Sequence, residues 1–313
     1  MPEQKPKAVF VMGPTAAGKT DLAVDLKEAL GGDIISVDSA MVYRGLDIGS
    51  AKPDPALLAR APHQLIDIRD PREGYSAAEF CADARAAMDA SHAAGRVSVL
   101  VGGTMLYFRA LQQGLAEMPA SDPAVRSGLE QQWQEQGPER LHQRLQGVDP
   151  EAARGIHPHN RQRLLRALEV YEISGRPISQ FWREQSQNRD SDSGLPYTVV
   201  PLALCPASRS RLHQRIEQRF DAMLEAGFIE EVAGLRALPG MHPDLASMRS
   251  VGYRQVWDYL EGHGSLEILR EKGLAATRQL GKRQLTWLRR WPGVHWLDSE
   301  SPDLSRQALK IIG

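Results

Sequence analysis

The segment that most constrains the fold is a glycine-rich run directly behind a short apolar stretch. Residues Ala8 to Met12 are all apolar, which is typical of a strand buried on both faces of a sheet. The pattern G-x-x-x-x-G-K-[ST] follows at once, and the next residues, Asp21 to Leu30, are predicted to form a helix. In this strand–loop–helix setting, backbone N–H groups of the loop and the helix point at an anion.

We therefore predict a polyphosphate site, for which ATP or GTP is the default ligand. Lys19 adds a positive charge, and the hydroxyl of Thr20 can ligate Mg²⁺. The residues that we predict to bind the phosphates are Gly13, Pro14, Thr15, Ala16, Ala17, Gly18, Lys19 and Thr20.

Strands and helices alternate through the first third of the chain. Further strands are predicted at Asp33–Val37, Gln64–Ile68 and Val97–Val101, with a helix from Ser76 to Ala94 before the last of them. This alternation indicates a parallel sheet covered by helices. Another strand, Thr198–Leu204, contains Pro201 and is therefore expected at an edge or an irregularity, and Val294–Leu297 is a late strand candidate.

Between Ser121 and Asn188 the sequence predicts helices and no strand. Asp122-Pro123 and Asp149-Pro150 each place a capping residue ahead of a Pro, and Asn160 can cap a helix that Gly175 ends. The predicted fold class is thus α/β, a P-loop NTPase-like parallel sheet core with an all-helical insertion domain. We place the core, with its Arg-rich C-terminal helices, at residues 1–118 and 197–313 and the insertion at residues 119–196.

Charge and composition limit the class of protein. The net charge of −1 over 313 residues excludes a globally basic nucleic-acid binder, but 30 of the 38 basic residues are Arg, which favours planar contacts to phosphates and stacking on bases. Residues 249–290 carry nine basic and four acidic side chains, although a solvated helix face is the plainer explanation. The two Cys form no disulfide framework, and no apolar run nears the roughly 18 residues of a membrane span. We predict a cytoplasmic protein without membrane contact.

Polar groups follow the predicted strands where a parallel sheet binds its ligands. Asp38 comes directly after the second strand, so we expect it beside the phosphate loop, where it can orient water or Mg²⁺ or accept a proton. The alternative is a turn cap. Gly102-Gly103 indicates either close approach of a ligand to the backbone or a tight turn.

Three arginines recur every four residues on a helix predicted from Ser208 to Ala226. Arg211, Arg215 and Arg219 form a column beside its apolar stripe. Such a column can clamp a leaving pyrophosphate or can simply be a solvated flank.

Several motifs together resemble the tRNA dimethylallyltransferase family, also called the IPP transferase family. The resemblance runs in order over nearly the whole chain. It is carried by the phosphate loop, Ile35–Pro53, Val101–Tyr107, Arg166–Tyr171, Gly252–Arg254 and Thr277–Arg289. The stretches around Asp38 and Lys282 are the most specific.

The resemblance implies transfer of a dimethylallyl group from dimethylallyl diphosphate to N6 of the adenosine just 3′ of the anticodon in tRNA. The phosphate loop would then hold a prenyl diphosphate, with Mg²⁺ on Thr20, in place of a nucleotide. The residues implied to be catalytic are Asp38 as general base, Thr104 near the reacting base and Arg219 on the leaving group. Arg219 is chosen over Arg215 as the residue that contacts the diphosphate only because its position matches the family.

The same resemblance implies a tRNA-binding set and a monomer that grips the anticodon stem-loop with its inserted helices. That set is Asp38, Ser39, Ala40, Met41, Thr104, Arg126, Gln162, Arg163, Leu164, Leu165, Arg166, Arg278, Lys282 and Arg283. Two other functions remain open: a small-molecule nucleotide kinase or adenylate prenyltransferase, and an RNA-binding protein that uses the loop as a nucleotide switch.

Overall fold

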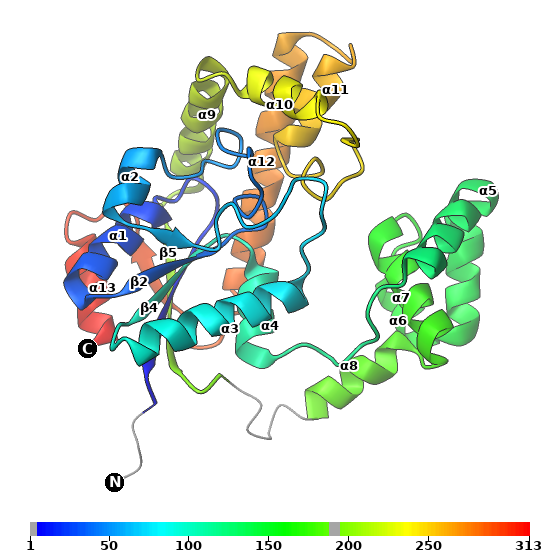
Figure 1. Ribbon diagram of the computed structural model, residues 1–313, viewed down its shortest axis with the longest axis horizontal. Coiled ribbons are helices and arrows are strands. Elements are labelled where there is room, and N and C mark those ends of the chain that lie inside the picture. Colours follow the sequence, from blue (N-terminus) through cyan, green and yellow to red (C-terminus); the bar gives the residue numbers. More distant parts are fainter. Residues whose placement is uncertain (1–4, 188–194) are drawn as a thin grey trace. The chain divides into compact units, whose positions relative to one another are not determined.

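The structure is a computed structural model that describes residues 5–187 and 195–313. The chain divides into two compact units, one of residues 1–112 and 195–313 and the other of residues 113–194 (Figure 1). The first unit is built on a sheet of six strands, which are β1 (Lys7–Met12), β2 (Asp33–Val37), β3 (His63–Gln64), β4 (Ser98–Gly102), β5 (Thr198–Cys205) and β6 (His295–Asp298). Their order is β3-β2-β4-β1-β5-β6, and every pair is parallel. The predicted α/β class with a parallel sheet is confirmed.

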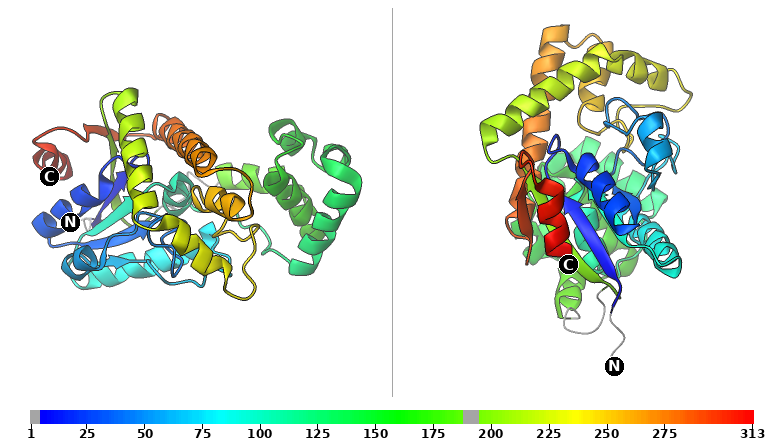
Figure 2. Two further views of the ribbon diagram at one scale, coloured as in Figure 1. Left: turned by 90° about the horizontal axis from the view of Figure 1, so that it is seen from above. Right: turned by 90° about the vertical axis from the view of Figure 1, so that its left-hand side faces the viewer.

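Helices cover both faces of the sheet because the side chains of its central strand alternate between two cores. Val9 and Val11 pack toward α1 (Lys19–Leu30) and α13 (Leu304–Ile312), while Phe10 and Met12 pack toward α3 (Ala77–Ala93) and α4 (Met105–Gln113). Figure 1 shows these two pairs of helices on opposite sides of the sheet, and Figure 2 shows the same arrangement from two further directions. A short helix, α2 (Pro55–Arg60), precedes β3. Residues 13–20 therefore begin at the carboxyl end of a fully buried central strand.

One expectation about the strands was wrong in detail, and the expectation for Pro201 holds only locally. The strand predicted at Gln64–Ile68 ends at Gln64, because Leu65 and Asp67 take left-handed backbone conformations with φ of 64° and 57°. Pro201 does not mark an edge strand, since β5 lies between β1 and β6. Pairing with β6 begins only at Leu202, so the side of β5 next to Pro201 needs no N–H donor.

The remaining helices of the first unit form a third core. They are α9 (Arg209–Glu225), α10 (Phe228–Arg236), α11 (Tyr253–Leu260) and α12 (Leu266–Leu288). Their apolar faces enclose Val42, Tyr43 and Leu46 from the segment after β2. This packing brings the Arg-rich C-terminal helices to the segment that follows Asp38.

The second unit is helical throughout its described part, residues 113–187. Its helices are α5 (Pro123–Val148), which is kinked at Gly137 before Pro138, α6 (Pro150–Gly155), α7 (Arg161–Ser174) and α8 (Ile178–Gln187). The side chains of Asp122, Asp149 and Asn160 cap α5, α6 and α7 as predicted. Leu129, Leu145, Leu168 and their neighbours give this unit a core of its own. Across the described parts of both units, no helix is long and apolar enough to cross a membrane.

Candidate active site

The phosphate loop has the backbone that its sequence predicts. Gly18 caps α1 in a left-handed conformation with φ of 82°, and Ala16 has φ of 63°, an unfavourable value for a residue with a side chain. Gly13 packs so closely on the Leu204 carbonyl that a Cβ atom would collide with it. The loop is therefore fixed against β5 at one end and opens the first turn of α1 at the other.

Cations converge on this loop from two elements. The Lys19 amine donates to the Pro14 carbonyl at 2.8 Å, and the Arg219 guanidinium of α9 donates to the Thr15 hydroxyl. Burial, together with the charge of Arg219, lowers the pKa of Lys19 to about 8, and Asp38 partly offsets this. Burial likewise lowers the pKa of Arg219, against the charge of Asp38. The protein thus concentrates positive charge beside the phosphate loop.

The arginine column on α9 is mostly engaged, so it is not a solvated flank. Arg215 donates to the Ser299 hydroxyl at 3.0 Å and lies so close to Gly18 that a Cβ there would be 3.1 Å from its guanidinium. Arg211, by contrast, pairs with Glu300 at 2.6 Å, away from the loop. Both Arg215 and Arg219 therefore border the phosphate loop.

Asp38 caps the turn that follows β2. Its Oδ1 accepts the N–H groups of Ala40 at 2.8 Å and Met41 at 3.3 Å, which is a turn cap. Its negative charge also offsets part of the lowering of the pKa values of Lys19 and Arg219, so Asp38 lies near both cations.

Thr104 lies beside the Asp38 turn. Its hydroxyl accepts the Ser39 N–H at 3.2 Å, and its own N–H donates to the Val37 carbonyl at 3.3 Å. The ends of β2 and β4 are thus bonded to each other, and the structure brings Asp38, Thr104, Lys19 and Arg219 into one site.

The double glycine after β4 is a site of close packing within the protein. A Cβ atom on Gly102 would collide with the Val37 carbonyl, and one on Gly103 would collide with the Gln284 amide. The two glycines are therefore required by close approach of protein atoms to this backbone, whichever of the two expected explanations also applies.

Sequence reasoning missed Gln284 on α12. Its side chain is 7% exposed, its Oε1 accepts the Thr15 N–H at 2.9 Å and its Nε2 donates to the Gly103 carbonyl at 2.9 Å. No local signal sets it apart, because Gln279 on the same helix is also an uncharged polar residue next to a basic one.

A carboxylate on α10 holds the segment after Asp38. Glu231 accepts the N–H groups of Asp47, Ile48 and Gly49 at 3.1, 2.6 and 3.2 Å and the Tyr253 hydroxyl at 2.6 Å. The segment that carries the most specific motif is therefore fixed by partly buried polar contacts to the C-terminal helices.

The basic residues predicted to bind tRNA on α12 differ in their surroundings. Lys282 and Arg283 are exposed, whereas Arg278 is partly buried and lies 3.8 Å from Glu217. The two exposed residues can meet a phosphate without first breaking an ion pair.

In the second unit, two predicted tRNA-binding residues are part of the core. Leu164 and Leu165 are fully buried, so their side chains hold α7 in place. Gln162 and Arg163 are exposed on the first turn of the same helix.

Two arginines of this unit are already paired. Arg166 donates to the buried Glu169 at 2.8 Å and to the Pro119 carbonyl at 2.7 Å, and Arg126 donates to Glu130 at 3.1 Å. Arg166 thus ties the segment before α5 to α7.

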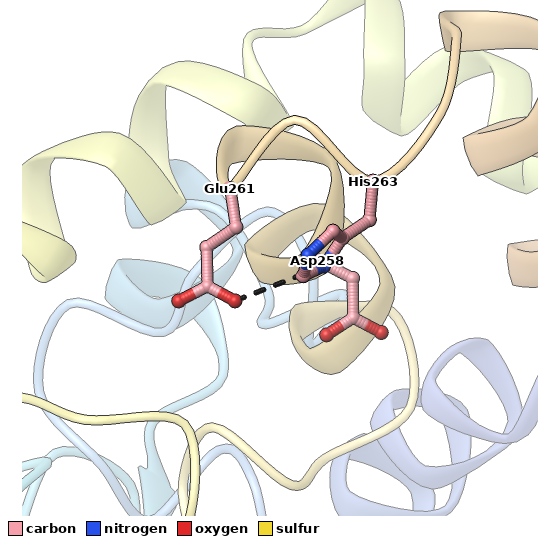
Figure 3. Close-up of side chains that lie close together, drawn as sticks. All are labelled: Asp258, Glu261 and His263. Atoms are coloured by element: carbon pink, nitrogen blue, oxygen red, sulfur yellow. Dashed lines mark ion pairs between the residues drawn. The ribbon is translucent and has the colours of Figure 1, made fainter.

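One cluster with metal-ligand chemistry occurs among the described residues, and it lies away from the phosphate loop. Asp258, Glu261 and His263 gather at the end of α11 (Figure 3). The His263 ring lies 3.9 Å from the Glu261 carboxylate, which also accepts the indole N–H of Trp257. Asp258 pairs with Arg254. These partners account for the cluster, so it adds no metal site to the candidate active site.

Comparisons with known proteins agree on one family. A family model described as IPP transferase matches residues 41–291. The tRNA dimethylallyltransferase of Chromohalobacter salexigens is 55% identical over 312 residues, which cover 100% of this chain and 98% of the relative. The crystal structure of the tRNA isopentenylpyrophosphate transferase of Bacillus halodurans is 36% identical, with a TM-score of 0.69 and coverage of 98% of this chain and 95% of that one.

A eukaryotic dimethylallyltransferase acting on tRNA shares the fold. Its TM-score is 0.79 at 24% identity, with coverage of 98% of this chain and 78% of that one.

Proposed function

The chain belongs to the IPP transferase family, and we propose that it transfers a dimethylallyl group from dimethylallyl diphosphate to N6 of the adenosine 3′-adjacent to the anticodon of a tRNA. The observation that carries the proposal is the position of Asp38, which caps the turn after β2 beside Thr104 and lies near enough to the partly buried cations Lys19 and Arg219 to act on their pKa values. A proton acceptor thus lies close to a site that can bind an anion. A nucleophilic substitution with a diphosphate leaving group requires both.

The reaction forms a bond from N6 to the allylic carbon and breaks the bond from that carbon to the diphosphate oxygen, while one proton passes from N6 to Asp38. The adenine amine is a weak nucleophile because its lone pair is delocalised into the ring, so it must be positioned and must lose a proton. Asp38 accepts that proton as N6 bonds to the allylic carbon. The carbon–oxygen bond breaks, and its electron pair leaves with the diphosphate. Loop N–H groups, Lys19, Arg215 and Arg219 stabilise the charge on the departing oxygens.

The residues at the loop fit a divalent metal, which we propose to be Mg²⁺. The Thr20 hydroxyl stands in the first turn of α1 and offers an oxygen donor, and diphosphate oxygens would complete most of the coordination. Bound there, Mg²⁺ would neutralise part of the diphosphate charge.

We propose that Thr104 and the Asp38–Met41 turn contact the flipped adenosine and its neighbours, because they meet at the adjacent ends of β2 and β4. Exposed Arg163, Lys282 and Arg283 would bind the tRNA backbone. The chain would act as a monomer.

The test uses the purified full chain with labelled dimethylallyl diphosphate and an anticodon stem-loop RNA. We expect label on N6 of the target adenosine, no transfer after EDTA treatment, and recovery on addition of Mg²⁺. Transfer to free AMP without RNA would favour an adenylate prenyltransferase. ATP hydrolysis or phosphoryl transfer without prenylation would favour the nucleotide-dependent alternatives.

A further inference from the structure

We propose that Gln284 is a positioning residue that fixes the distance between the donor and acceptor halves of the active site. The proposal rests on the proposed function, because it names a determinant of the same transfer reaction. Gln284 touches neither of the reacting atoms in our scheme.

The carboxamide of Gln284 forms hydrogen bonds to two different loops, one through its oxygen and one through its nitrogen. Oε1 accepts the N–H of Thr15 in the phosphate loop, and Nε2 donates to the carbonyl of Gly103 at the end of β4, both at 2.9 Å. An amide supplies an acceptor for the Thr15 N–H and a donor for the Gly103 carbonyl, whereas a carboxylate of the same length would present a second acceptor to the carbonyl. The residue type therefore matches both partners.

Each loop carries one half of the chemistry. Thr15 also accepts from Arg219, so its backbone belongs to the diphosphate side. Gly103 precedes Thr104, whose hydroxyl accepts from Ser39 beside Asp38, so it belongs to the adenosine side. Hydrogen bonds, together with the peptide bond between Gly103 and Thr104, thus connect the diphosphate loop through Gln284 to the Asp38 turn.

Packing makes this link rigid. The side chain is 7% exposed, and a side chain on Gly103 would collide with the Gln284 amide, so only glycine admits the contact. A buried side chain with both ends bonded has little freedom to change rotamer. Because a misplacement of about 1 Å between reacting groups can cost on the order of 100-fold in rate, such a link affects turnover more than binding.

The experiment compares Gln284→Met, which removes both bonds at similar length, with Gln284→Glu, which keeps the bond to Thr15 and loses that to Gly103. Gln307→Met is the matched control, because Gln307 is exposed on α13 and also loses a side-chain hydrogen bond, to Ser301. For each variant, kcat and both KM values are measured with dimethylallyl diphosphate and the stem-loop RNA, and thermal unfolding reports the folded fraction.

We expect kcat to fall at least about tenfold in both Gln284 variants, with each KM within about threefold of wild type. Wild-type kcat in either folded variant would overturn the proposal. So would a loss of rate that matches a loss of folded protein, or a loss confined to one KM. If the wild type transfers no prenyl group, the proposed function itself has failed, and that result is read before any variant.

Discussion

Replacing Asp38 by Asn tests the proposed chemistry most directly, because it removes the proton acceptor while sparing the turn. Asp38 Oδ1 accepts the Ala40 and Met41 N–H groups at 2.8 and 3.3 Å, and an amide oxygen can accept the same two bonds. The segment should therefore keep its conformation. Loss of a general base typically costs about 10²- to 10⁴-fold, so we expect kcat to fall within that range.

The substitution has a second effect that the assay must separate from the first. Asp38 raises the pKa of Lys19, which burial and Arg219 hold at about 8, so Asp38→Asn lowers that pKa further. At pH 8 the variant would then bind the diphosphate with a less charged amine, and its donor KM would rise. At about pH 6.5 the wild-type Lys19 is protonated, and at saturating donor a weaker binding of the diphosphate no longer limits the rate, so the loss in kcat measured there reports the missing base.

The matched control is Asp122→Asn. Asp122 makes the same kind of cap, accepting the N–H groups of Ala124 at 2.8 Å and Val125 at 3.1 Å, but caps α5 in the second unit. Single-turnover prenylation of a stem-loop RNA at saturating donor measures the chemical step for both variants. An Asp38→Asn rate within about threefold of wild type at pH 6.5 would refute the assignment of the base.

Three further outcomes follow from the same contacts. For the wild type, kcat/KM for dimethylallyl diphosphate should fall as pH rises through about 8, because free Lys19 then loses its charge, while Lys19→Met should show a lower value without that pH dependence. Glu231→Gln should lower the free energy of unfolding by about 1–3 kcal/mol in urea titrations. Both carboxylate oxygens of Glu231 accept backbone N–H groups, and the amide of Gln would turn its own N–H groups toward some of these donors. An unchanged midpoint would contradict this. Gly49→Ala should cost about 1–3 kcal/mol in the same assay, because its methyl group would overlap the Phe228 ring, and wild-type stability would show that the ring can move aside.

Local signals in the sequence predicted the frame of the site well. The buried run before Gly13 and the helix after Thr20 fixed where the loop sits, since a strand buried on both faces must lie inside the sheet. The caps at Asp149 and Asn160 located helix starts for the same reason, because orphan N–H groups need a nearby acceptor. The family resemblance then supplied the reaction.

Contacts between distant segments could not be predicted in this way. Gln284 lies 269 positions from Thr15, and nothing local distinguishes its amide from those on exposed helix faces. The strand expected at Gln64–Ile68 failed similarly, because left-handed backbone at Leu65 and Asp67 depends on tertiary contacts, which include the bond from Lys52 to Asp67 at 2.6 Å. Local propensity is overridden where packing determines the conformation.

The charge balance of the site explains why a chain of this fold suits an anionic donor. Lys19 and Arg219 lie near Asp38, and burial lowers the pKa values of both. Without a bound anion, the positive charge of these two side chains therefore destabilises the folded protein. Lowering the pKa of Lys19 from 10.5 to about 8 corresponds to about 3 kcal/mol. This penalty is fully present below pH 8 and is relieved as pH rises toward 10.5, because the unfolded chain then binds more protons than the folded one. A bound diphosphate reverses the sign: it favours the charged amine, raises its pKa, and converts a destabilising feature of the free protein into affinity for the donor.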